Sequence, residues 1–94
     1  LKALEKRSGL NIEIYFYIAQ VYSSELNDNE SAISLYKNLK TENPYMSDIR
    51  LALVQLYSRM ENYEKAIKEL EEWLIISPDE VKAKELLQYL QSEA

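Results

Sequence analysis

The chain has 94 residues, of which 47% are hydrophobic and 29% are charged, and its formal net charge is −5. This composition is typical of soluble globular proteins. No stretch approaches the ~18 uninterrupted apolar residues of a membrane span, and we recognise no secretory leader. The acidic charge disfavours a nucleic-acid partner, because proteins that bind nucleic acid usually carry a basic stripe. We therefore expect a cytoplasmic protein that binds neither nucleic acid nor membrane.

Helical periodicity runs along the chain and predicts six helices and no strands. Apolar residues between Ile49 and Met60 recur at i, i+3, i+4 and i+7, the spacing of one helix face. Gly9 is expected to end the first helix, and Pro44 ends the third because it disfavours α geometry at the residue before it. The predicted helices cover residues 1–8, 12–26, 30–42, 47–60, 63–76 and 78–92.

Capping residues set the predicted helix starts. Asn11, Ser47 and Asn62 each precede a predicted helix, and their side chains can accept hydrogen bonds from its first backbone N–H groups. The segment Ser77–Glu80 has the pattern of a capping box, with Pro78 in the first helical position. Of these four signals, the capping box is the clearest prediction of a helix start.

Residues of the same type return after 34 or 35 positions. The recurring pairs are Ala32 and Ala66, Leu39 and Trp73, Pro44 and Pro78, Gln20 and Gln55, and Tyr22 and Tyr57. The first three pairs are 34 residues apart and the last two are 35 apart, which predicts a one-residue insertion in a loop within residues 23–31. Similarity at a fixed period indicates stacked supersecondary units, none of which can bury its apolar face alone.

The repeat resembles that of the tetratricopeptide repeat (TPR) family, whose frame includes Y…A-x3-F…P. The frame positions of the second repeat are Tyr57, Ala66, Leu70 and Pro78. The chain departs from the family frame at Tyr15, where the family has Trp, and at Ala19 and Val54, where it has Gly. The resemblance implies an all-α fold of antiparallel helix pairs stacked in a right-handed α-solenoid. Within it, small residues such as Ala66 allow helices to cross closely, and Trp73 fills the core.

The resemblance also predicts how the single TPR-like domain 1–94 is organised. Residues 1–10 would be the tail of an upstream repeat, 11–45 the first repeat, 46–79 the second and 80–94 a C-terminal capping helix. The chain begins with Leu1 and not Met, so we expect it to be a fragment of a longer protein. Leu1 and Leu4 should pack partly against Ile14 or Ile18. The apolar edge left there predicts homo-oligomers at high concentration, since solenoid ends normally need polar faces.

A second stripe lies off the predicted packing face of the first helix in each repeat, and an acid, an apolar residue and Gln recur along it. The resemblance implies that this face lines the concave groove in which family members bind peptides. The candidate peptide-binding residues are Glu13, Phe16, Tyr17, Gln20, Asp48, Leu51, Gln55, Arg59 and Tyr89. We expect them on one continuous, solvent-accessible concave surface. Its acidic rim, which includes Glu85, would favour a basic peptide.

Catalysis and cofactor binding are not expected. The chain has no histidine and no cysteine, and it lacks a Gly-rich phosphate loop and a nucleophile elbow. The acids Glu69, Glu71 and Glu72 are better explained as a solvated helix face than as a metal site. We predict a protein–protein interaction module that is not an enzyme. The alternative is a structural spacer or a set of self-association repeats within a larger protein, in which neighbouring repeats would cover Phe16 or Tyr17.

Overall fold

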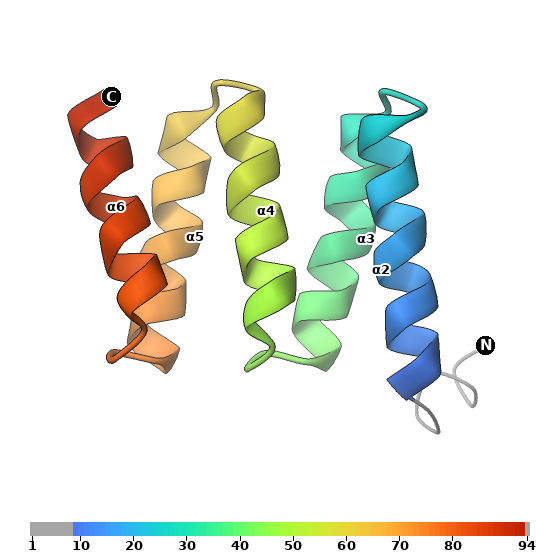
Figure 1. The fold of residues 1–94 in the computed structure, drawn as a ribbon, viewed down its shortest axis with the longest axis horizontal. Coiled ribbons are helices and arrows are strands. Elements are labelled where there is room, and N and C mark those ends of the chain that lie inside the picture. Colours follow the sequence, from blue (N-terminus) through green and yellow to red (C-terminus); the bar gives the residue numbers. More distant parts are fainter. Residues whose placement is uncertain (1–8, 94) are drawn as a thin grey trace. The chain divides into compact units, whose positions relative to one another are not determined.

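The computed structural model describes residues 9–93, with side chains described for residues 12–92. This part of the chain contains five α-helices joined by short turns and no strand (Figure 1). The helices are α2 (Gly9–Ser24), α3 (Asn29–Glu42), α4 (Ser47–Arg59), α5 (Tyr63–Ile76) and α6 (Val81–Glu93). The predicted all-α repeat fold is confirmed. The predicted helix at residues 1–8, and with it the packing of Leu1 and Leu4, lies outside the described residues.

The chain forms two compact units, Leu1–Pro44 and Tyr45–Ala94. In the first unit, α2 and α3 pack against each other as an antiparallel pair (Figure 1). Ala19 on α2 and Ala32 on α3 are completely buried, together with Tyr36 and Leu39. Small side chains surrounded by larger ones are typical of two helices that cross closely.

In the second unit, α5 packs against both α4 and α6, and each helix is antiparallel to the one before it (Figure 1). The positions that recur from the first unit are again buried: Ala66 replaces Ala32, and Trp73 replaces Leu39. Ala83 on α6 is buried as well. The prediction that Trp73 fills the core is therefore confirmed.

The loops between paired helices differ by the predicted residue. Residues 25–28 join α2 to α3, whereas only residues 60–62 join α4 to α5, so the insertion predicted within residues 23–31 is confirmed. Each loop ends on a side chain that caps the next helix. Asp28 accepts a hydrogen bond from the backbone N–H of Ser31, and Asn62 accepts one from that of Lys65. The Asn62 cap was predicted, whereas the equivalent cap at Asp28 was not.

Three predicted helix starts are wrong. Helix α2 already includes Gly9 and Asn11, because one glycine inside a helix costs only about 1 kcal/mol, which the continuing hydrogen bonds offset. Helix α4 includes Ser47, and its cap is the extended residue Met46, which makes no side-chain capping bond. The predicted capping box at Ser77–Glu80 is a turn, in which the Glu80 N–H donates to the Ser77 carbonyl, and α6 begins only at Val81.

Candidate functional site

In the first unit, the candidate residues all lie on α2. Glu13, Tyr17 and Gln20 are exposed, and the Tyr17 side chain is 65% accessible. Phe16 is half-buried, because its ring packs edge-on against the buried Tyr36 of α3, with the ring centroids 5.6 Å apart. The face thus offers a carboxylate, a phenol and an amide to solvent. Phe16, which was expected to be accessible, contributes mainly to the packing of α2 on α3.

In the second unit, α4 carries the same stripe 35 residues later. Asp48, Leu51 and Gln55 are spaced at i, i+3 and i+7, and therefore share one face of the helix. Asp48 and Gln55 are exposed, while Leu51 is half-buried like Phe16. Arg59 is exposed in the last turn of α4, opposite in charge to Asp48 in the first turn. These two charges also suit the helix dipole, so they have a structural role besides any role in binding.

Tyr89 is the one candidate on α6, which packs against α5. Its side chain is 60% accessible. It takes the place along α6 that Gln55 takes along α4, 34 residues earlier. A phenol can donate and accept a hydrogen bond while presenting an apolar ring, which suits a surface that binds protein.

Serine hydroxyls along the stripe bond within their own helices. Ser23 and Ser24 both donate to the carbonyl oxygen of Gln20, over 3.2 Å and 2.7 Å, and Ser92 donates to that of Tyr89 over 2.8 Å. A hydroxyl that bonds back to its own helix offers less to a partner. The glutamine amides are therefore the main uncharged polar groups that the stripe presents.

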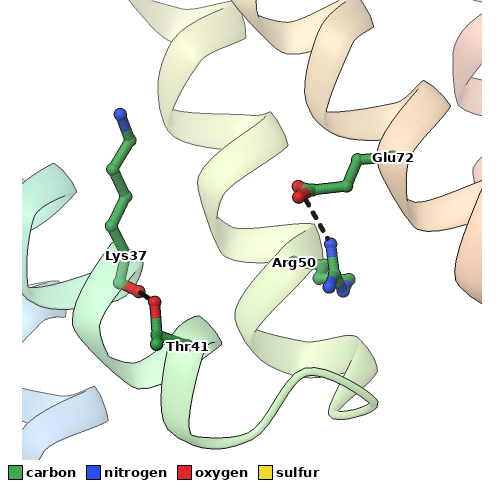
Figure 2. A network of polar contacts seen from close by, with 4 residues as sticks. All are labelled: Lys37, Thr41, Arg50 and Glu72. Carbon is green, nitrogen blue, oxygen red and sulfur yellow. Dashed lines mark hydrogen bonds and ion pairs between the residues drawn. The ribbon is translucent and has the colours of Figure 1, made fainter.

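Arg50 is a notable residue that sequence reasoning missed. It lies on α4 and is only 2% exposed, and its guanidinium Nη1 is 3.3 Å from a carboxylate oxygen of Glu72 on α5 (Figure 2). Arg50 stands 35 residues after Tyr15, so the repeat register was the signal that could have marked it as a packing position. Glu72 was assigned to a solvated face. Its side chain is half exposed, and it also joins the two helices.

Two features were sought among the described residues without success. No group of three or more carboxylates there is arranged to hold a metal ion. None of the described helices combines the length and the hydrophobicity that crossing a membrane would require.

The comparison with known families agrees with the repeat register. The family model described as tetratricopeptide repeat matches residues 23–90, more than two thirds of the chain. Among curated proteins, none matches the sequence. The matched segment contains all of α3, α4 and α5 and most of α6. The chain belongs to the tetratricopeptide repeat family.

Proposed function

We propose that this chain is a protein-interaction module that holds an extended peptide against the exposed stripe of its first helices, chiefly that of α4. Tetratricopeptide repeats generally mediate protein–protein interactions, and the peptide is the finer part of the proposal. The observation that carries it is the recurrence of an exposed acid and an exposed glutamine, Glu13 with Gln20 and Asp48 with Gln55, at a spacing of 35 residues.

The chemistry of the stripe suits a peptide backbone. A glutamine side chain carries both a donor and an acceptor, so Gln20 and Gln55 can pair with a peptide group whatever its side chain is. The half-buried Leu51 adds apolar surface beside Gln55. The acids Glu13 and Asp48 favour a partner that carries Lys or Arg, because complementary charge steers association and orients the peptide.

The direct test is a peptide array, followed by fluorescence-polarisation titration of the strongest peptide with two pairs of variants. Gln55→Ala should weaken binding at least about 5-fold, since losing a hydrogen bond costs roughly 1 kcal/mol. Its control is Gln88→Ala, which removes an exposed glutamine from α6 outside the stripe. Asp48→Asn should weaken binding of basic peptides more at low salt than at high salt. Its control is Glu64→Gln, the acid in the first turn of α5.

The controls separate binding from stability. Asp48 and Glu64 both lie in a first helical turn, so neutralising either one costs a similar interaction with the helix dipole. If each variant and its control weakened binding equally, the stripe on α4 would not be the binding surface. If the array selected acidic peptides, the assignment of a basic partner would be wrong.

A further inference from the structure

Helix α2 has a second exposed surface, which goes beyond the proposed function. Ile14, Tyr17, Ile18 and Val21 follow at i, i+3, i+4 and i+7 and turn away from the buried Ala19, which marks the side of α2 that packs in the core. We name these four residues the outer face of α2. Ile14 is 46% exposed, and Ile18 and Val21 are half-buried. A helix that is apolar on both of its sides is typical of one that is covered on both.

The second repeat shows what this surface is like when it is covered. The residues 35 positions later than Ile14, Ile18 and Val21 are also apolar, and all of them are buried. They are Ile49, Leu53 and Leu56, on α4. Both helices thus carry the same apolar positions, but only those of α4 are removed from solvent. Exposed apolar residues that line one helix face mark a contact surface.

We propose that the outer face of α2 binds the same face of a second copy of this chain, with the two helices antiparallel. A two-fold axis between Tyr17 and Ile18 places Ile14 of each copy near Val21 of the other. The i, i+3, i+4, i+7 spacing is the one that two helices use when they pack side by side along a seam. The surface is self-complementary in this arrangement, as a two-fold dimer requires.

Charge favours a second copy and the antiparallel direction. The outer face itself carries no ionised residue. The exposed Glu25 follows the last residue of α2, and Lys6 and Arg7 precede its first residue in the sequence. Antiparallel pairing brings the acidic end of one helix towards the basic end of the other. Parallel pairing would instead place Glu25 beside Glu25 and Glu13 beside Glu13.

The size of the surface predicts a weak dimer. A helix of 16 residues is about 24 Å long, and one helix pair of that length buries less than the roughly 1,200 Å² of a stable complex. We therefore expect a dissociation constant of about 10 μM to 1 mM, so that the dimer forms only in concentrated solution.

Sedimentation equilibrium of the 94-residue chain between about 10 μM and 2 mM tests the dimer. Ile14→Lys should weaken it at least about 10-fold, because the lysine would have to be desolvated in the seam. Ile75→Lys is the matched control: Ile75 is 80% exposed on α5, and its replacement should leave the dissociation constant unchanged. Circular dichroism verifies that both variants keep their helix content. Tyr17 is left unchanged because it belongs to both proposed surfaces.

A second pair of variants tests the direction. Glu25→Lys should weaken the dimer about 2- to 5-fold at low salt, whereas Glu42→Lys, an exposed site on α3 with the same change in charge, should not. A wild-type chain that stays monomeric at 2 mM would overturn the proposal, as would equal dissociation constants for Ile14→Lys and Ile75→Lys. Equal effects of Glu25→Lys and Glu42→Lys would overturn the antiparallel direction. Ile14 lies outside the peptide stripe, so peptide binding can fail or succeed independently of this test.

Discussion

Glu61 has a backbone conformation that most residues avoid. Its φ is 60°, and the equivalent Asn27, 34 residues earlier, has φ 56°. Both lie just before a capping residue, where the chain reverses between paired helices. After α4, the Asn62 N–H donates back to the Tyr57 carbonyl over 2.8 Å, which is the bond that a left-handed residue at a helix end makes possible. Asn tolerates this conformation better than Glu does.

Glu61→Gly should therefore stabilise the chain. Glycine has no Cβ to clash in the left-handed region, and the gain should be about 0.5–1 kcal/mol after the larger entropy of glycine in the unfolded chain is allowed for. Urea denaturation should show a higher midpoint with an unchanged slope. The control is Glu61→Gln, which removes the charge but keeps the Cβ and should not stabilise. A midpoint that rose as much for Gln as for Gly would mean that charge, and not backbone conformation, was relieved.

Arg50 shows why a buried charge is hard to predict from the sequence. The first repeat has Tyr15 at the equivalent position, and pattern analysis treats an arginine as a surface residue. A long side chain can nevertheless bury its aliphatic stem while its guanidinium reaches a carboxylate. Glu72 supplies that carboxylate from α5. Only the three-dimensional neighbours of α4 reveal this pairing, because the two residues are 22 positions apart.

At the level of the helices, the pattern of apolar residues predicted the elements better than local signals predicted their starts. The ranges predicted for the third and fifth helices agree closely with α3 and α5, because Pro44 and Asn62 act as expected. Ser77–Glu80 failed for a physical reason. Proline has the same φ in the first position of a helix and in the second position of a turn, so Pro78 suits both. The packing of α6 on α5 decides between them, and the local sequence does not contain it.

The crossing of α5 with its neighbours supplies a stability test. Ala66 is completely buried on α5, so Ala66→Leu should overpack the core and lower the free energy of unfolding by about 1–3 kcal/mol. Chemical denaturation should show the midpoint falling accordingly. Lys68→Leu is the control, because Lys68 is exposed on the same helix and its replacement should change stability by less than about 0.5 kcal/mol. An unshifted midpoint for Ala66→Leu would contradict close packing at this residue.

At the level of the whole molecule, the sequence predicted which helices carry the stripe, but it predicted the accessibility of the stripe less well. The acid and the glutamine of each stripe are exposed as predicted. Phe16 is not, because its ring packs on Tyr36, and a spacing rule cannot tell a residue at the edge of the core from one outside it. Tyr17 and Ala52 occupy equivalent positions with different exposure. The partner follows from surface chemistry that has no counterpart inside the chain, so it remains a proposal.

Nuclear magnetic resonance provides the most direct test of peptide binding to the stripe. The ¹⁵N-labelled chain would be titrated with the strongest basic peptide from the array, at a protein concentration of about 50 μM. The proposed function predicts the largest shift changes at the side-chain amides of Gln20 and Gln55 and along the backbone of α2 and α4. The amides of α3 and α5 should move little. Changes confined to α3 and α5, or none at millimolar peptide, would contradict it.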